Sequence, residues 1–588
     1  MAIYPVTPVP DGSTVRRLEA YDVLVYTEGG HYYAKDLRGD LICVDSPTAC
    51  LQEAVNYVAQ LGGGKILVKK GTYYPKKTII IPDGINLVID GEGNNTVFRY
   101  TNQMYLFRHV PPNSTWTSVI IFRNFKVDRT GSGSNNWDII AVNYAKYVMF
   151  DGIEIIDDFR VSNGDAGIVG YNNIVAVAQN CRIFNKSYGI WLGAFLGVAR
   201  NNYINNTAQV GIGLFGLNEG FTLPPGYSYG GLSIVEDNVA VDCGQTDECL
   251  AVDYGPVTRS YGIGIIRNNL VMTVNNPSYV MIAGNADKFI IENNDMEGPA
   301  KASAVVMWGY RATQAIVKNN RFNITYINVT SPLIVSNYQM LVLENNSMSV
   351  AYNNISANIE DVLHLLDIKA FVKNNSIRAS VPAGYIVNNF IRFNVDSSDI
   401  NPGYTMVESN ELFIDSSVNN LIGVFLVGNY STSKPQIIVS KNLINASSTV
   451  NKLLYITIYG NLAYAFVRDN QLNANVANVV GATTNQSGVA VYLDTDTGTL
   501  FRPDATMSYY YYRKNSGMVK FSGDGTTTQF KIAHGLANAP SRALVTPASK
   551  DAASSFYVTT DNTYIYVNYT TAPPAGTDNV VLYWYAEV

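Results

Sequence analysis

The sequence predicts an all-β fold made of stacked coils of parallel strands. Its composition, with 41 tyrosines among 588 residues and many asparagines, favours strands and turns over long helices. A six-residue pattern recurs between residues 125 and 470 with a mean spacing of about 29 residues, which indicates a repeat architecture. Between its copies, short β-branched runs alternate instead of showing the three-and-four spacing of a helix. The repeat therefore predicts a β-solenoid.

The repeated pattern reads apolar, any residue, polar, Asn, any residue, apolar, and its first copies hold Phe125, Ile153 and Cys181 at the fourth position. A position that accepts both apolar side chains and asparagine along one stack is expected to point inward, with the amides hydrogen-bonded in a buried ladder. The residue before it, often Asn, Asp or Gly, suits a left-handed turn. The ladder asparagines are Asn202, Asn238, Asn269, Asn294, Asn320, Asn346, Asn375, Asn410, Asn442 and Asn470.

The N-terminal region is expected to lead into the solenoid and cap it. Residues 1–44 form a β lead-in with strand-like stretches at 21–26 and 31–36. Residues 46–61 predict a helix with Ser46 at the N-cap and Pro47 in the first turn, followed by glycines 62–64 as the stop signal. A solenoid needs such a cap because its open end invites edge pairing.

Residues 50–98 carry a family resemblance. The stretch joins the helix, a Gly-rich turn, Gly71-Thr72-Tyr73, and Ile81-Pro82-Asp83-Gly84 leading to Gly91-Glu92-Gly93. It resembles the N-terminal signature of the pectate lyase superfamily. The resemblance covers about residues 45–500 and implies a right-handed parallel β-helix. That fold carries lyases, hydrolases, epimerases and non-enzymatic viral spikes, so it does not specify one reaction.

The C-terminal part of the chain follows a different pattern. The ladder has stopped by residues 501–520, which we interpret as a neck or linker. Residues 521–588 read as short strands with turn signals and predict a small β-sandwich. This module is similar to terminal modules of β-helix tail and spike proteins of viruses, including archaeal viruses. The chain is thus expected to be of the viral tailspike type.

Charge and hydropathy exclude some partners. The net charge is −6 and no Lys/Arg-rich run occurs, so no nucleic-acid partner is expected. No stretch of about 18 apolar residues occurs, so membrane insertion is not predicted. The start of the sequence lacks the pattern of a secretory signal. Thirteen N-x-S/T sequons, such as the one at Asn328, fit an extracellular glycoprotein. The expected location is a virion surface or the extracellular space.

The five cysteines form two close pairs and one remainder. Cys43 with Cys50 and Cys243 with Cys249 are disulfide candidates, although the sequence does not fix the connectivity. No C-x-x-C motif occurs and the four histidines are far apart, so no metal site is predicted from these residue types.

Two long, adjacent intervals of the repeat, 36 and 31 residues, predict loops where a site could sit. The first loop is rich in Gly, Pro and aromatic residues, a composition suited to sugar stacking. Together with tryptophans on nearby coils, the candidate ligand-binding residues are Trp191, Phe215, Phe221, Tyr227, Tyr254 and Trp308. Packing at a coil corner is the alternative for the tryptophans.

The second loop contains four carboxyl groups, Asp242, Asp247, Glu248 and Asp253. Glycoside hydrolysis needs two carboxyl groups about 5 to 9.5 Å apart, and neighbouring coils place equivalent side chains at about 5 Å, so these four are the candidate catalytic residues. Residues 247–252 look like the acidic strand of polygalacturonases, but the Gly-His-Gly and Arg-Ile-Lys motifs of those enzymes are missing. A lyase of the superfamily would use Ca²⁺; no other cofactor is expected. The alternative is that these acids are solvated loop charges.

Three functions remain open at this point. The first is a virion surface spike or host-attachment protein that binds cell-surface polysaccharide or glycoprotein and contacts other virion proteins. The resemblance implies a homotrimer for such a spike. The second is a polysaccharide lyase or glycoside hydrolase. The third is a structural appendage or surface-layer component.

Overall fold

The computed structural model describes residues 21–588, except for 112–114, 132–136, 159–163, 218–222, 225, 228–229, 255–261, 309–312, 367–368, 397–403, 428–435, 459–462, 474–475, 485–490, 496–509, 513 and 537–538. The chain divides into two compact units, residues 1–233 and 234–588, called unit 1 and unit 2 below. The strand β20 (Leu232–Glu236) spans the point of division.

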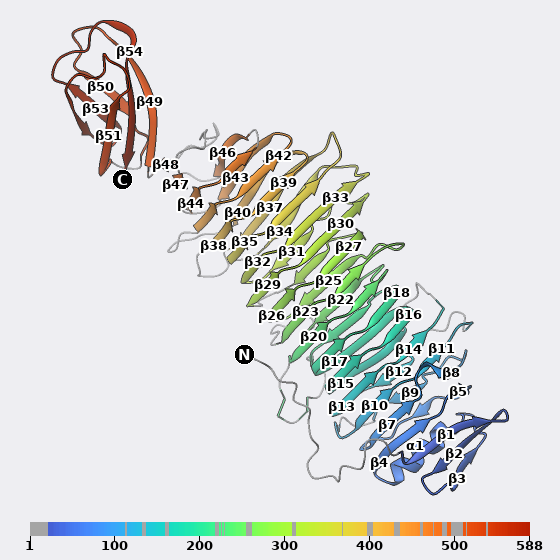
Figure 1. The fold of residues 1–588 in the computed structure, drawn as a ribbon. Coiled ribbons are helices and arrows are strands. Elements are labelled where there is room, and N and C mark those ends of the chain that lie inside the picture. Colours follow the sequence, from blue (N-terminus) through green and yellow to red (C-terminus); the bar gives the residue numbers. More distant parts are fainter. Residues whose placement is uncertain are drawn as a thin grey trace. The chain divides into compact units, whose positions relative to one another are not determined.

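Unit 1 is a parallel β-solenoid whose strands form three ladders. Successive coils contribute strands to the three ladders, and in two coils one long strand runs through both ladder 1 and ladder 2. Figure 1 shows the strands of unit 1 lying side by side. Ladder 1 contains β6 (Ile79–Ile80), β9 (Phe107–His109), β12 (Ile140–Val142), β15 (Ala166–Gln179), β17 (Tyr188–Arg200) and β19 (Ile212–Phe215). Ladder 2 contains β1 (Val23–Glu28), β4 (Gly63–Val68), β7 (Asn86–Gly91), β10 (Val119–Arg123), β13 (Tyr147–Asp151) and the second halves of β15 and β17. Ladder 3 contains β5 (Gly71–Tyr73), β8 (Thr96–Arg99), β11 (Lys126–Asp128), β14 (Glu154–Ile156), β16 (Arg182–Lys186) and β18 (Tyr203–Thr207).

Unit 2 repeats this three-ladder arrangement. Its ladder 1 contains β22 (Glu248–Asp253), β25 (Val280–Asn285), β28 (Val305–Trp308), β31 (Ile334–Asn337), β34 (Ile359–Leu365), β37 (Ile386–Asp396), β40 (Ser417–Val427), β43 (Val450–Ile458) and β46 (Val476–Thr484). Its ladder 2 contains β23 (Ile263–Arg267), β26 (Lys288–Glu292), β29 (Gln314–Lys318), β32 (Met340–Glu344), β35 (Lys369–Lys373), β38 (Tyr404–Glu408), β41 (Gln436–Ser440), β44 (Ala463–Arg468), β47 (Val491–Thr495) and β48 (Tyr510–Tyr512). Its ladder 3 contains β21 (Val239–Val241), β24 (Leu270–Met272), β27 (Asp295–Ala300), β30 (Arg321–Ile327), β33 (Ser347–Asn353), β36 (Ser376–Ser380), β39 (Glu411–Ile414), β42 (Leu443–Ala446) and β45 (Gln471–Asn473).

The asparagine ladder is confirmed, and in unit 2 it runs from Asn238 to Asn470. At Asn294, the backbone N–H and the side-chain Nδ2 both donate to Oδ1 of Asn320, at 2.9 and 3.0 Å. The same Nδ2 donates to the Ile266 carbonyl at 2.9 Å, so one buried amide joins three successive coils. The preceding residue takes the left-handed conformation, as at Asn293 with φ 56°. The all-β, parallel-solenoid prediction therefore holds for the described residues.

The N-terminal lead-in is a hairpin, as the sequence predicts, but the capping helix begins later than predicted. β1 pairs antiparallel with β2 (His31–Asp36), which pairs with β3 (Leu41–Val44). The helix α1 spans Leu51–Gln60, with Cys50 at its N-cap, so Ser46 is not the N-cap and Pro47 is not in the first turn. The reason is that Ala49 and Cys50 have φ of 52° and 62°, which no α-helix accommodates. The glycine stop is confirmed, with Gly62 at φ 77°. A short 3₁₀ turn, η1, follows at Gly93–Asn95.

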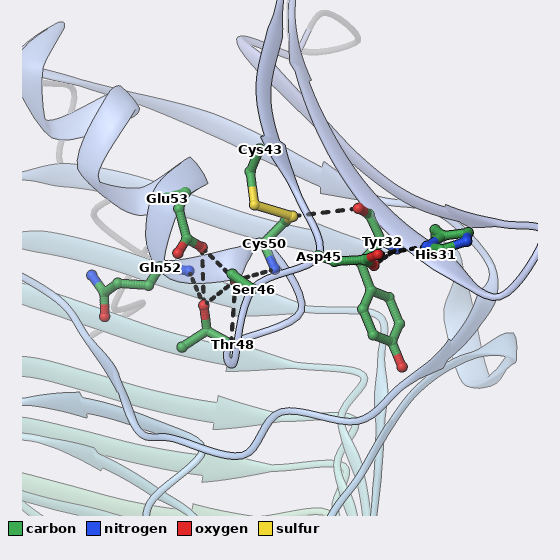
Figure 2. Close-up of a disulfide and its surroundings, with 9 residues drawn as sticks. All are labelled: His31, Tyr32, Cys43, Asp45, Ser46, Thr48, Cys50, Gln52 and Glu53. Atoms are coloured by element: carbon green, nitrogen blue, oxygen red, sulfur yellow. Dashed lines mark hydrogen bonds and ion pairs between the residues drawn. A yellow bond between two sulfur atoms is a disulfide. The ribbon is translucent and has the colours of Figure 1, made fainter.

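The turn before α1 is held by a disulfide and a polar cluster (Figure 2). Cys43 and Cys50 are joined, which confirms the first candidate pair. The Ser46 hydroxyl accepts the Cys50 N–H at 2.9 Å and donates to the Glu53 carboxylate at 2.8 Å. Ser46 thus fixes the approach to the helix rather than its first turn.

The C-terminal strands form two antiparallel sheets around one apolar core. The sheets are β49 (Lys514–Gly523), β54 (Gly576–Glu587) and β51 (Arg542–Pro547), and β50 (Gln529–Ala533), β53 (Tyr564–Tyr569) and β52 (Phe556–Thr560). Phe530, Ile565 and Leu582 from the two sheets meet in the core. This is the predicted β-sandwich, although its first strand begins at Lys514 rather than at residue 521.

Candidate functional site

An aromatic surface lies on the outer face of ladder 1 in unit 1. The rings of Trp191 and Phe215 are 5.1 Å apart, and Trp191 is also 5.1 Å from Tyr188. Phe215 is 5.6 Å from Tyr171, and Tyr105 is 5.1 Å from Trp137. We call this surface the aromatic platform, and its six members are Tyr105, Trp137, Tyr171, Tyr188, Trp191 and Phe215.

Glycines on the neighbouring strands make room for the rings of the aromatic platform. In the register of ladder 1, Trp191 is opposite Gly213 and Gly193 is opposite Phe215. A Cβ on either glycine would overlap with the opposite ring, so each ring lies on bare backbone. Ala141, Ala166 and Val169 form the floor beneath Tyr105, Tyr188 and Trp191. Phe215 is 9% exposed, whereas Trp137 and Tyr171 are 38% and 36% exposed, so these two rings carry most of the accessible aromatic area of the platform.

A buried ion network in unit 1 is connected to the platform through the backbone of Trp137. Lys186 Nζ is 2.9 Å from Asp157 and 2.5 Å from Asp165, and all three side chains are at most 3% exposed. Arg129 is 3.3 Å from Asp157 and donates to the Trp137 carbonyl at 3.2 Å. Because buried charges must be paired, these carboxylates are committed to the network, and through Arg129 the network holds the backbone of a platform residue.

The other predicted aromatic residues lie elsewhere. Tyr227 contacts Phe195 edge-on, with ring centroids 4.9 Å apart. Tyr254 is buried at 3% exposure and its hydroxyl donates to the Ile263 carbonyl at 3.0 Å. Trp308 in unit 2 is 49% exposed, so the corner-packing alternative does not hold for it. Phe221 lies outside the described residues. The structure thus brings together Trp191 and Phe215 of the six.

The predicted acidic residues in unit 2 separate into two environments. The Asp242 carboxylate accepts backbone N–H groups of Val274 and Asn275 at 2.6 and 3.0 Å, so it anchors a loop. Burial raises the pKa of Glu248 to about 8, with further contributions from a hydrogen bond to the Asp247 carboxyl and from the charges of Asp247 and Asp253. Glu248 therefore carries a proton at neutral pH.

The second cysteine pair is not a disulfide in this structure, so that candidate pairing is corrected. Cys243 and Cys249 are both buried thiols. Burial raises the pKa of Cys249 well above its ordinary value, and a hydrogen bond with Cys243 adds to the shift. Cys249 retains its proton because a buried apolar site disfavours the thiolate.

The described residues contain neither a metal-binding cluster nor a membrane-spanning helix. Across the described ranges, no group of three or more His, Cys, Asp or Glu side chains is placed to hold a metal ion. Within the same part of the chain, no helix has the length and apolar character needed to cross a membrane.

Comparison with known proteins finds similar architectures at low sequence identity. No protein-family model matches the chain, and no curated protein does. Among solved structures, the tailspike of Pseudomonas phage phi297 is 10% identical, with 92% of each chain covered and a TM-score of 0.40. The tailspike of Pseudomonas phage LKA1 is 13% identical over 92% of each chain, with a TM-score of 0.35. The tailspike of E. coli bacteriophage HK620, solved in complex with a pentasaccharide, is 12% identical over 94% of this chain and 92% of that chain, with a TM-score of 0.32.

Proposed function

We propose that this protein is a virion-surface attachment protein that binds a cell-surface saccharide through the aromatic platform. The observation that carries the proposal is the pair of rings, Trp191 and Phe215, which lie against Gly213 and Gly193 and join the platform to the exposed rings of Tyr171 and Trp137. The C–H faces of a pyranose ring stack on such rings, and a row of rings along a ladder accommodates successive sugar units.

A charged group at the edge of the platform, Arg108, orients the bound sugar in this proposal. The guanidinium of Arg108 lies 5.4 Å from the Tyr105 ring centroid at the platform edge, where it is exposed. Its donors are available to sugar hydroxyls while the ring holds the sugar face. Binding by stacking with few fixed polar contacts fits attachment to a repeated polymer.

An extracellular or virion location is supported by the cysteine chemistry. The chain holds the Cys43–Cys50 disulfide, and such bonds persist in oxidising surroundings and are rare in cytosolic proteins.

The same proposal includes binding to other proteins of the particle and a homotrimeric state. Mass spectrometry of purified particles tests the location, and chemical crosslinking of the purified protein tests the trimer; absence from particles would remove the attachment role.

The binding test uses the full chain and purified host envelope polysaccharide. Trp191→Ala is expected to weaken binding by about tenfold or more, since truncation of a central aromatic contact in a binding surface often costs about 2 kcal/mol. Gly213→Ala is expected to weaken it as well, because the added methyl lifts the Trp191 ring. The matched control is Tyr557→Ala, an aromatic residue 61% exposed in the C-terminal sandwich. Unchanged binding by folded Trp191→Ala would contradict the proposal.

A glycoside hydrolase is the second candidate, and the protonated Glu248 is the observation that favours it. A carboxylic acid that keeps its proton up to about pH 8 is suited to protonate a glycosidic oxygen. Its hydrogen bond to Asp247 places those two carboxyls closer than the spacing of a glycosidase pair, so Asp253 is the candidate for the second carboxylate. New reducing ends from host polysaccharide, lost in Glu248→Gln, would establish hydrolysis. An unsaturated-sugar absorbance that depends on Ca²⁺ would instead indicate the lyase.

A further inference from the structure

A row of apolar side chains faces outward along ladder 2 of unit 2. In β26, β29, β32, β35, β38 and β41 the central residue of the strand is partly exposed and lies between two buried neighbours. The register places these central residues directly opposite one another. We call them the apolar row: Ile290, Ile316, Val342, Phe371, Met406 and Ile438. The same register extends the row to Ile265 on β23 and Phe466 on β44.

Strand propensity does not by itself account for the apolar row. Ladder 3 of unit 2 runs through the same coils, and its corresponding outward positions are mostly polar: Glu297, Asn323, Ser349, Arg378, Phe413 and Asn445. Both ladders consist of parallel strands, so the difference between them points to different surroundings. A face that stays in water tolerates polar side chains, whereas an apolar face of a parallel sheet is stabilised when it is covered.

Unit 1 has the same feature in its own ladder 2. There, successive strands place partly exposed apolar residues opposite one another: Val88, Ile121, Met149, Val177 and Val198. The apolar character of this ladder is therefore a property of both units rather than of a few coils.

Charged residues border the apolar row at the carboxyl end of each strand. Acidic and basic side chains alternate there in the register: Glu292, Lys318, Glu344, Lys373 and Glu408. Lys318 is 2.9 Å from Glu292 and Lys373 is 3.9 Å from Glu408, so these four charges are paired within the chain. The opposite border holds Lys288 and Lys369 among uncharged residues. An apolar centre inside a polar rim has the anatomy of a protein interface.

The dimensions of this face fit a second copy of the chain. Eight coils at about 4.8 Å give a row about 34 Å long, and three outward residues per strand make the face about 20 Å wide. Each copy can therefore bury about 700 Å², near the roughly 800 Å² per partner of a stable interface. Another copy carries side chains at the same spacing, so one row fits between the residues of the next along its whole length. A partner without this repeat would match it at a few coils only.

We propose that the apolar row is the surface through which copies of this chain pack against one another. Copies related by an axis parallel to the solenoid bring identical rows together, with Ile316, Val342 and Phe371 near the middle of the contact. This inference rests on the homotrimer included in the proposed function, and it assigns the face at which the copies meet. The aromatic platform belongs to ladder 1 of unit 1 and contributes no residue to this face.

The first test compares two glutamate substitutions in the full chain by sedimentation velocity. The parent protein is expected to sediment as a trimer. Val342→Glu is expected to raise the dissociation constant at least about tenfold, because assembly would bury carboxylates that face one another. The matched control is Ser349→Glu, which changes an outward position of the next strand, in ladder 3, and is expected to sediment like the parent.

Milder variants cover the case in which Val342→Glu disturbs folding. Ile316→Thr keeps a β-branched side chain on the strand but makes the row polar, and it is expected to weaken assembly in the same direction. Ile316→Cys is expected to crosslink between copies with a short bismaleimide, whereas Ser349→Cys is not. The three free thiols of the parent do not compete, because Cys181, Cys243 and Cys249 are buried.

A monomeric parent protein would overturn this inference. Unchanged assembly in folded Val342→Glu and Ile316→Thr would also overturn it, and would leave the homotrimer standing on a different face. Equal crosslinking of Ile316→Cys and Ser349→Cys would count against it in the same way. Polysaccharide binding measured on the same samples tests the attachment proposal separately, because the two surfaces share no residue.

Discussion

Single residues show how the same chemical group acquires different roles in this solenoid. Asp242 and Glu248 lie six positions apart, yet the first anchors a loop by accepting backbone N–H groups, whereas burial and the hydrogen bond to Asp247 raise the pKa of the second. The sequence predicted both as candidate catalytic carboxyls because it shows acidity but not the partners of each group. Their environments depend on which backbone amides and which carboxyl lie within reach, and that is decided by folding.

At the residue scale, Glu248 predicts a pH dependence of stability. Its folded-state pKa of about 8 lies above the ordinary value of 4.5, so the folded protein retains a proton that the unfolded chain releases between these values. The free energy of unfolding is therefore expected to fall as pH rises from about 4.5 to 8. Glu248→Gln should remove about 2 kcal/mol of this fall, a value reduced from the full shift because the group is partly solvated.

Urea unfolding between pH 4 and pH 9 measures this effect. The control is Glu411→Gln, an exposed glutamate of β39, which should keep the pH profile of the parent protein. Identical profiles for Glu248→Gln and the parent would show that Glu248 titrates normally.

At the element scale, the asparagine ladder joins coils through side chains as well as through backbone. Asn320 Oδ1 accepts both a backbone and a side-chain N–H from Asn294, and Asn320 Nδ2 donates to the Ile291 carbonyl at 3.0 Å. Asn294, Asn320 and Asn346 are each 2% exposed, so water does not reach their side-chain amides to replace a lost hydrogen-bond partner. The ladder is therefore a continuous set of buried and satisfied amides.

Removal of one rung is expected to be costly. Asn320→Ala leaves two donors of Asn294 and the Ile291 carbonyl without that partner, and we expect a loss of about 2–4 kcal/mol in the free energy of unfolding. Asn323→Ala, three positions later and exposed on β30, should change it by no more than about 0.5 kcal/mol. Chemical denaturation of both variants measures the contrast, and a similar small effect of each would show that the ladder adds little.

At the scale of the whole molecule, the solenoid and the C-terminal sandwich have different sources of stability. The solenoid coils bury their apolar residues only when stacked, whereas the C-terminal sandwich closes its own core from Phe530, Ile565, Val567, Leu582 and their neighbours. Local closure of this kind indicates an autonomous domain.

A fragment of residues 514–588 is accordingly expected to fold by itself. Its amide NMR spectrum should be well dispersed, and heating should give one cooperative transition. The matched variant Leu582→Ala removes a core side chain and is expected to lower its stability by about 2–5 kcal/mol. A collapsed spectrum for the parent fragment would show that the sandwich depends on the rest of the chain.

Some predictions succeeded because the chemistry they used is local. The left-handed residue before each ladder asparagine, the glycine stop at Gly62 and the hairpin ahead of the cap are set by neighbours in sequence. The start of α1 was missed because the Cys43–Cys50 link and the left-handed Ala49 and Cys50 delay the first turn, and helix signals in sequence do not reveal such constraints.

The sequence by itself determined that this protein is a solenoid of parallel strands, because a buried amide must recur in register if each coil is to satisfy the next. It also singled out Trp191 and Phe215. Only the tertiary structure decided that Tyr105, Trp137, Tyr171 and Tyr188 join them, and that Arg392 lies over Phe425. Alternation along a strand fixes which side chains point outward, but coil length and register fix which of them become neighbours.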